Sequence, residues 1–267
     1  MIDFEKGLAL WDHPEIVYRL FFPRQEFAGE PNLLNAKNHF IKVADDIAIG
    51  CRFYPVRNDA PNILYFHGNG ETVPDYDYVA PVYQKKGLNL FVTDYRGYGM
   101  SDGSPTSGSM IRDTHPIFQG FITFLQNLNY TGNLFVMGRS LGSAPAIEVA
   151  YRYQQQIKGL IIESGFASGR NQLKRLGVSH LLRDVKDPIG FGNDEKIKEI
   201  TIPTLIIHGE EDEIIPATEG RALYALSGAK EKHSLFIPNA GHNDIMMRGL
   251  EAYMGAVERF IAEVHSS

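Results

Sequence analysis

The pentapeptide Gly-Arg-Ser-Leu-Gly, residues 138–142, constrains the fold of this chain more than any other feature. An apolar run at residues 133–137 comes before it, and a stretch with helical character, Ser143–Tyr153, follows it. G-x-S-x-G between a strand and a helix is typical of a nucleophile elbow, a tight turn that presents a serine hydroxyl above a parallel sheet. We therefore expect Ser140 to adopt a strained backbone conformation, with glycines at 138 and 142 because side chains there would meet neighbouring backbone.

The composition is that of an ordinary folded domain. The 267 residues are 43% hydrophobic and 22% charged, and their number suits one large domain over residues 1–267. The net charge is −6 and the lysines and arginines are scattered, which excludes the basic patch of a nucleic-acid-binding protein. No nucleic-acid partner is expected.

Cys51 is the only cysteine, so no internal disulfide can form. It lies in an apolar stretch and is expected to be a buried structural thiol. The lack of disulfides favours a reducing compartment, and we expect a cytoplasmic location. Residues 1–11 mix acids with apolar side chains, unlike a secretory signal, and the longest apolar runs have the length of strands. No transmembrane helix or other membrane anchor is expected.

Apolar runs of strand length alternate with helical patterns along the chain. Strands are expected at 40–44, 47–54, 63–66, 88–93, 134–137, 159–163, 204–207 and 234–237. Helices are expected at 76–86, 109–128, 143–153, 218–226 and 244–264. The first two strands should form a hairpin, and the later, continuously apolar strands are typical of a parallel sheet. This alternation predicts an α/β fold with about eight mostly parallel strands and helices on both faces.

The least regular internal segment, residues 164–201, holds five glycines and a short helical stretch near residues 173–182. It is either a small cap or insertion above the sheet, or an ordinary connection with one helix. Its larger apolar side chains either line an apolar pocket or pack the helix onto the sheet. These side chains are Leu173, Leu176, Leu181, Leu182 and Phe191.

A serine hydroxyl becomes a useful nucleophile when a base accepts its proton and an acid orients that base. Both groups are available later in the chain. Asp212 follows the apolar run 204–207, and His242 follows the run 235–238. The carboxyl ends of strands are where open α/β sheets place their sites, so Ser140, Asp212 and His242 are expected to meet there.

These segments resemble those of the α/β-hydrolase superfamily over roughly residues 40–264. Residues 67–70, His-Gly-Asn-Gly, are similar to its oxyanion loop, and residues 94–101 to the D-x-R-G-x-G-x-S turn after its fourth strand. Residues 208–216 resemble its H-G-x-x-D-x-x-x-P acid loop, and Gly241-His242 the loop that bears the base. The order serine, acid, histidine is also the order of that superfamily.

The sequence of residues 94–105 most resembles a branch of this superfamily that contains acyl-protein thioesterases and many uncharacterised serine hydrolases. Several members of that branch carry an N-terminal membrane anchor or palmitoylated cysteines, and this chain has neither near its N-terminus. This departure from the branch argues against a membrane-protein substrate, and we expect a small-molecule or acyl substrate.

The resemblance also implies a role for each site residue. Ser140 is the nucleophile, His242 is the general base and then the acid, and Asp212 orients His242. The main-chain N–H groups of Asn69 and Leu141 form the oxyanion hole. No metal or organic cofactor is implied, and no spacing typical of metal ligands links the other histidines. These are His13, His39, His115, His180, His233 and His265.

The expected activity is hydrolysis of an ester or thioester through an acyl-serine intermediate. A peptidase or amidase with the same three residues is one alternative. A non-catalytic binding protein is another, because a fold does not fix a function. Four polar residues near the motifs are expected to be structural, and Arg139 is expected to face solvent or a neighbouring acid without an assigned role. The four are His67, His208, Asp94 and Arg96.

Overall fold

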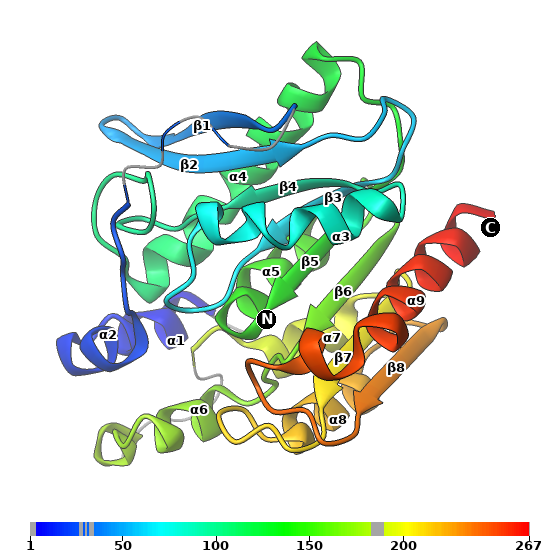
Figure 1. Cartoon of the computed structure of the whole chain (residues 1–267). Helices are drawn as coiled ribbons and strands as arrows, with labels where there is room; N and C mark the ends of the chain where they lie inside the picture. The colour runs from blue at the N-terminus through cyan, green and yellow to red at the C-terminus, as the bar shows by residue number, and fades with distance from the viewer. Residues whose placement is uncertain (1–3, 27–28, 30, 32–34, 183–189, 267) are drawn as a thin grey trace.

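Within residues 4–26, 29, 31, 35–182 and 190–266, which the computed structural model describes, eight strands form one sheet (Figure 1). Their spatial order is β1-β2-β4-β3-β5-β6-β7-β8. The strands are β1 (Lys37–Ala44), β2 (Ile47–Tyr54), β3 (Asn62–Phe66), β4 (Asn89–Thr93), β5 (Leu134–Arg139), β6 (Gly159–Glu163), β7 (Thr204–Gly209) and β8 (Lys232–Ile237). This is the mostly parallel α/β sheet that the sequence predicts.

The antiparallel strand pairs of this sheet all involve β2, near the start of the chain. β2 is antiparallel to both β1 and β4, and the hairpin between β1 and β2 turns at Asp45 and Asp46. From β4 through β3, β5, β6 and β7 to β8, every neighbouring pair is parallel. The carboxyl ends of these six strands therefore lie at one edge, where the loops that follow them gather.

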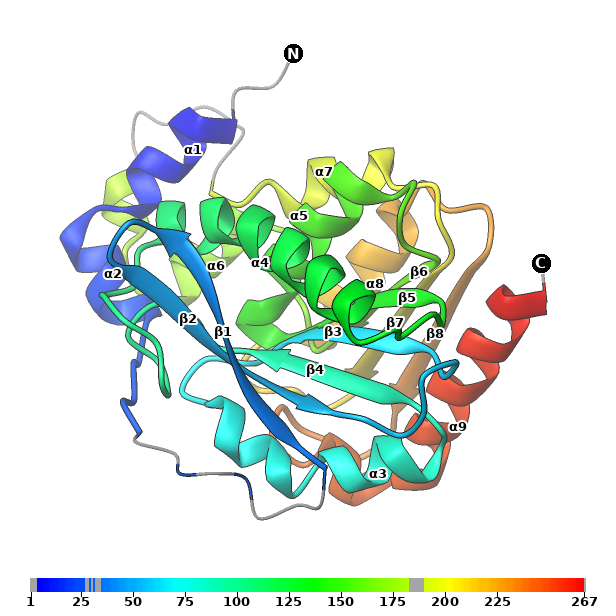
Figure 2. The same ribbon diagram turned by 90° about the horizontal axis from the view of Figure 1, so that it is seen from above.

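Helices cover both faces of the sheet. Figure 2 shows α4, α5, α7 and α8 on one side and α3 and α9 on the other. Two separate apolar cores fill these layers, one around Phe118 and Ile147 and the other around Tyr83 and Val257. The helices are α1 (Phe4–Trp11), α2 (Pro14–Leu20), α3 (Ala80–Lys85), α4 (Ser107–Asn127), α5 (Ser143–Tyr153), α6 (Gly169–Arg175), α7 (Asn193–Glu199), α8 (Ala217–Leu226) and α9 (Ile245–Ser266).

The helix expected at 76–86 is shorter and is preceded by a separate turn. A 3₁₀ turn occupies Val73–Asp77, and α3 begins at Ala80 with Pro81 in its first turn. Proline lacks the N–H that a continuous helix would need at this position, so the segment divides there. No helix among the described residues combines the length and the apolar character needed to cross a membrane.

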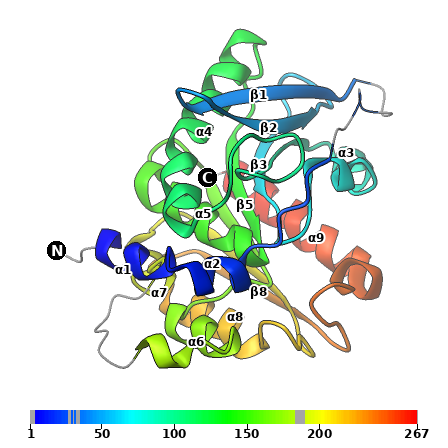
Figure 3. The same cartoon turned by 90° about the vertical axis from the view of Figure 1, so that its left-hand side faces the viewer.

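α1 and α2 have no counterpart in the sequence-based expectation. α1 lies against α4 (Figure 3). The fully buried ring of Trp11 packs 4.6 Å from the ring of Phe191. Ser107 Oγ donates to the Trp11 carbonyl at 3.2 Å, and the Gly108 N–H donates to Asp12 Oδ1 at 2.8 Å. These contacts join α1 to the first turn of α4 and make it part of the larger core.

Residues 164–201 contain α6, a 3₁₀ turn at Ser179–Leu182, and α7, while residues 183–189 lie outside the described part of the chain. Leu173, Leu182 and Phe191 are buried in the larger core, and Leu181 packs against it. Leu176 also borders a surface cavity. The described apolar side chains of this segment therefore pack onto the body of the molecule, and a role as a lid stays a prediction.

Candidate active site

The turn after β5 has the backbone expected of an elbow. Ser140 has a φ of +53°, in the left-handed region that L-residues rarely adopt. A Cβ added to Gly138 would lie 2.1 Å from the Gly142 carbonyl oxygen, and one added to Gly142 would lie 2.1 Å from the Phe66 carbonyl oxygen. Both positions exclude any side chain, which is the physical reason for the two glycines of the motif.

The structure brings Ser140, His242 and Asp212 together at the carboxyl edge of the sheet. Ser140 Oγ lies 2.8 Å from His242 Nε2, and His242 Nδ1 lies 2.7 Å from Asp212 Oδ2. All three side chains are nearly buried. A carboxylate can only accept, so His242 carries its proton on Nδ1 and presents the Nε2 lone pair to the serine hydroxyl. This arrangement has the geometry of a general base beside a nucleophile.

Asp212 is held in place by the turn that follows β7. Its Oδ1 accepts hydrogen bonds from the main-chain N–H groups of Ile214 and Ile215, at 2.9 and 2.7 Å. Burial alone would raise the pKa of Asp212, but hydrogen bonds from His208 and His242 outweigh burial and lower that pKa well below its ordinary value. Asp212 is therefore a stable anion beside His242.

His208 supports Asp212 from the strand side. Its Nε2 lies 2.8 Å from the Ile215 carbonyl oxygen and 3.3 Å from Asp212 Oδ2. The neighbouring acid Glu210 turns instead to Arg221, with 3.2 Å between Oε1 and Nη2. Among the acids of this loop, Asp212 is thus the one that meets His242, and His208 has the structural position that the sequence suggests.

The side chain of Asn69 binds the C-terminal end of α2 and the segment that follows it. Its Nδ2 donates to the Leu20 carbonyl at 2.6 Å, and its Oδ1 accepts from Tyr98 Oη at 2.6 Å and from the Phe22 N–H at 3.0 Å. The amide side chain thereby fixes the shape of the loop after β3. The main-chain N–H groups of Asn69 and Leu141 stay candidates for the oxyanion hole.

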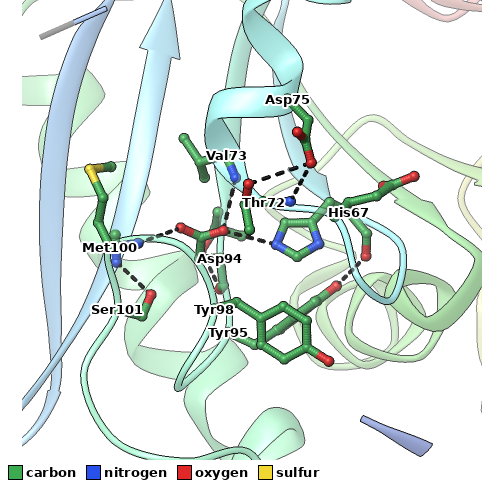
Figure 4. Close-up of polar contacts among 12 residues, drawn as sticks. His67, Thr72, Val73, Asp75, Asp94, Tyr95, Tyr98, Met100 and Ser101 are labelled. Atoms are coloured by element: carbon green, nitrogen blue, oxygen red, sulfur yellow. Dashed lines mark hydrogen bonds and ion pairs between the residues drawn. The ribbon is translucent and has the colours of Figure 1, made fainter. Parts of the chain in front are cut away.

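His67 and Asp94 form a buried polar centre beneath that loop (Figure 4). His67 Nε2 lies 3.1 Å from Asp94 Oδ1, and His67 Nδ1 lies 2.8 Å from the Gly68 carbonyl oxygen. Asp94 also accepts from the main-chain N–H groups of Val73 and Met100, at 2.9 and 3.3 Å. His67 and Asp94 therefore join the loops after β3 and β4, in agreement with the structural roles expected of them.

Arg139, left without a role by the sequence, is the centre of a second polar cluster. Its side chain is only 12% exposed and forms ion pairs with Glu71 and Glu163. The parallel pairing of β5 with β6 places Arg139 directly opposite Glu163 and so brings two members of this cluster together. That register could not be read from the sequence, because apolar runs locate strands without aligning them.

One group of described residues has a spacing that a metal ion could use. His233 Nε2 lies 3.7 Å from Glu231 and 3.6 Å from Glu263, and all three side chains are exposed. Exposed pairs of this kind are common without a metal, and none of these residues belongs to the Ser140 site. The side chain of His265 lies outside the described part of the structure.

The sheet order, the single antiparallel strand β2 inside it, and the strained serine after β5 define an α/β hydrolase. Comparison with known proteins gives the same result, and the chain belongs to the α/β-hydrolase superfamily. Residues 58–187 match a family described as "Serine aminopeptidase, S33".

Two curated proteins are similar over most of the chain. Protein bem46 of Schizosaccharomyces pombe is 30% identical over 207 residues, which are 76% of this chain and 68% of that protein. Alpha/beta hydrolase domain-containing protein 17B of Homo sapiens is 29% identical over 223 residues, which are 80% of this chain and 71% of that protein. Among solved structures, Est1E from Butyrivibrio proteoclasticus with bound ferulic acid has a TM-score of 0.69 at 20% identity, covering 86% of this chain and all of that one. This last likeness concerns the fold alone.

Proposed function

We propose that this protein is a serine hydrolase that cleaves a carboxylic ester or thioester through an acyl-Ser140 intermediate. The observation that carries the proposal is the continuous hydrogen-bond chain from Ser140 through His242 to Asp212. It supports a hydroxyl activated by a neutral imidazole that a buried carboxylate orients.

In this proposal His242 Nε2 takes the proton of Ser140 as Oγ attacks the substrate carbonyl carbon. The N–H groups of Asn69 and Leu141 donate to the resulting oxyanion, and each such donor contributes on the order of 3 kcal/mol to the transition state. His242 then gives its proton to the leaving alcohol or thiol, and the acyl group stays on Ser140. Water, deprotonated by His242, releases the acid and restores the serine.

A peptidase or amidase reaction at the same three residues is the second candidate. The match of residues 58–187 to a family described as "Serine aminopeptidase, S33" favours it. Comparing kcat/KM on matched ester, thioester and amide substrates separates the two, and we expect the amide value to be far below the others. An amide value equal to the ester value would overturn the esterase proposal.

The catalytic assignment is tested with a fluorophosphonate probe, which reacts with activated serines. Wild type should be labelled and Ser140→Ala should not be. Equal labelling of the two proteins, or no labelling of a folded wild type, would favour a non-catalytic binding protein. A series of p-nitrophenyl esters of increasing chain length then defines the preferred acyl group.

The compartment is a separate part of the proposal. Cys51, the only cysteine, is buried and forms no disulfide, which supports a reducing compartment such as the cytoplasm.

A further inference from the structure

Arg139 lies between the first glycine of the elbow and Ser140, yet its side chain leaves the Ser140 site and enters the α3–α9 side of the sheet. Its guanidinium is enclosed by Glu71 and Glu163, and its neighbours Tyr65 and Tyr76 belong to the core on that side. Arg139 Nε donates to Glu163 Oε1 at 3.1 Å, and Nη1 donates to Glu71 Oε1. A buried arginine is therefore anchored to the strand that presents the candidate nucleophile.

The same guanidinium reaches the loop of the candidate base. Arg139 Nη2 donates to the His242 carbonyl oxygen at 2.9 Å and to Asn243 Oδ1 at 3.0 Å. The imidazole of His242 meanwhile contacts Ser140. Arg139, the last residue of β5, thus holds the main chain of His242, while Ser140, the next residue in the chain, contacts its ring.

Glu71 extends this connection to the loop that carries Asn69. Its Oε2 accepts from the Gly68 N–H at 2.7 Å and from Tyr76 Oη at 2.9 Å. A Cβ added to Gly68 would lie 2.5 Å from Arg139 Nη1, so the glycine admits the guanidinium at this point. Arg139 and Glu71 together fix the position of the peptide next to Asn69.

Glu163 closes the cluster at the end of β6. This carboxylate, only 2% exposed, also accepts from Tyr253 Oη at 2.6 Å and from Tyr65 Oη at 3.4 Å. Burial and the charge of Glu163 raise the pKa of both tyrosines well above its ordinary value, so their hydroxyls stay protonated and donate. Glu163 therefore accepts hydrogen bonds from two neutral hydroxyls and from the Arg139 cation, and is well suited to hold Arg139 rigidly.

We propose that Arg139 is a positioning residue that sets the distances between three loops: the Ser140 elbow, the Gly68–Asn69 loop and the His242 loop. The inference rests on the proposed function, since its readout is turnover at Ser140. Four hydrogen bonds to four residues use the planar, forked donor geometry that is particular to arginine. A lysine at this position keeps the charge but cannot reach all of these acceptors at once.

The cluster borders a cavity of about 470 Å³ whose lining includes Glu71, Arg139, Glu163 and Asn243. Shortening Arg139 to alanine would leave the two carboxylates facing this space. Free guanidinium has the size and the donors of the missing group, so it should bind there and restore part of the lost geometry. Recovery by a small molecule is a response that a general loss of stability would not give.

The experiment compares Arg139→Ala, Arg139→Lys and the matched control Arg96→Ala by kcat and KM on p-nitrophenyl acetate. Arg96 is another mostly buried arginine, with its side chain 23% exposed, and it forms two 2.7 Å hydrogen bonds to Asp113. Arg139→Ala should lose about 100-fold in kcat with little change in KM, because a misplacement near 1 Å costs that much. Arg139→Lys should stay well below wild type, and Arg96→Ala should lower thermal stability without lowering kcat.

Millimolar guanidinium should recover roughly tenfold of the loss in Arg139→Ala and should not raise the activity of Arg139→Lys or Arg96→Ala. If Arg139→Ala fails to fold, Glu71→Gln keeps the shape of the cluster, and we expect kcat to fall about tenfold. A folded Arg139 or Glu71 variant with wild-type kcat overturns the inference, as does a loss that guanidinium leaves unchanged. Failure of the fluorophosphonate to label wild type overturns the proposed function instead, and this inference with it.

Discussion

At the residue scale, Asp212 determines which nitrogen of His242 carries the proton. The turn after β7 donates two main-chain N–H groups to Asp212 Oδ1, which leaves Oδ2 to face His242 Nδ1. An amide at this position could present its NH₂ group to Nδ1 and stabilise the wrong tautomer. We expect Asp212→Asn to keep its fold and to lose about ten-thousand-fold in kcat.

Steady-state hydrolysis of p-nitrophenyl acetate, with circular dichroism to verify folding, measures this loss. The control is Glu210→Gln, which alters a half-exposed acid of the same loop that pairs with Arg221. Its kcat should equal that of wild type. If Glu210→Gln showed the large loss and Asp212→Asn did not, the orienting acid would have to be reassigned.

His67 is the second residue whose protonation matters. Both of its ring nitrogens face acceptors, the Gly68 carbonyl oxygen and Asp94 Oδ1, an arrangement that favours the charged ring with a proton on each nitrogen. Burial opposes this charge, but the hydrogen bond to Asp94 and its negative charge outweigh burial and raise the pKa of His67 above its ordinary value. Folding therefore takes up a proton at this site.

A raised pKa in the folded state stabilises the protein below the unfolded pKa of about 6.5, and the stabilisation is lost as pH rises through the folded pKa. We expect His67→Gln to unfold at a lower urea concentration than wild type at acid pH. The difference in the free energy of unfolding should shrink as the pH is raised above about 6.5. A difference that stays constant, or widens, with rising pH would show that His67 is not charged in the folded protein.

At the element scale, the sequence predicts elements with long patterns and misses those stabilised by distant contacts. β2, β6 and α5 have the expected bounds because apolar residues occur along the whole length of each. α1, α2 and α7 have only seven or eight residues each, and Trp11 of α1 depends on Phe191, which is far away in sequence. The order of motifs likewise predicts Ser140, Asp212 and His242, whereas the Arg139 cluster requires the register of β5 on β6.

α5, the helix behind Ser140, is joined to α7 by a buried ion pair. Lys196 Nζ lies 2.6 Å from Glu148 Oε2, and both side chains are almost fully buried. Nε of the exposed Arg152 lies 3.1 Å from the other carboxylate oxygen of Glu148, Oε1. Removing one partner of a buried pair leaves an uncompensated charge, so Glu148→Gln should cost about 3–5 kcal/mol in the free energy of unfolding. Arg152→Ala, which removes the exposed partner, should cost about 0.5 kcal/mol or less.

The Glu148–Lys196 pair also predicts that the free energy of unfolding falls at acid pH. Burial opposes the charge of Glu148, but Lys196 and Arg152 outweigh burial and lower the pKa of this carboxyl. Its stabilisation is complete above the unfolded pKa of about 4.3 and is lost as pH falls through the folded pKa. Urea unfolding at several pH values from neutral to acid measures this dependence. The free energy of unfolding of wild type should approach that of Glu148→Gln as the pH is lowered. An equal pH dependence of the two proteins would contradict the pair's contribution.

At the scale of the whole molecule, the N-terminal segment packs against the loops at the carboxyl ends of β3 and β4, on the side of the sheet that bears the site. After α2, the Gly99 N–H donates to the Arg24 carbonyl at 2.8 Å, and the Glu26 N–H donates to the Gly99 carbonyl at 3.0 Å. Leu20 and Phe22 meet the side chain of Asn69 just before this. The loop after β3 is thus held between the N-terminal segment and the loop after β4.

This arrangement makes the Asn69 side chain a link between the first helices and the candidate oxyanion hole. Asn69→Ala keeps the main-chain N–H but removes partners from Leu20, Phe22 and Tyr98. The Phe22 N–H keeps its second acceptor, Tyr98 Oη at 2.9 Å, but the Leu20 carbonyl and the Tyr98 hydroxyl lose their hydrogen bonds to Asn69. We therefore expect a loss of about 1–3 kcal/mol in the free energy of unfolding. We also expect kcat to fall about tenfold as the N–H of residue 69 loses its fixed position.

Phe22→Ala is the matched control, because the Phe22 side chain is 61% exposed and the substitution keeps the main-chain hydrogen bond to Asn69. It should change the free energy of unfolding by about 0.5 kcal/mol or less. Urea unfolding and p-nitrophenyl acetate kinetics on both variants separate two contributions of Asn69. A fall in stability without a fall in kcat would mean that Asn69 joins the N-terminal segment to the sheet and that the oxyanion donor lies elsewhere in the loop.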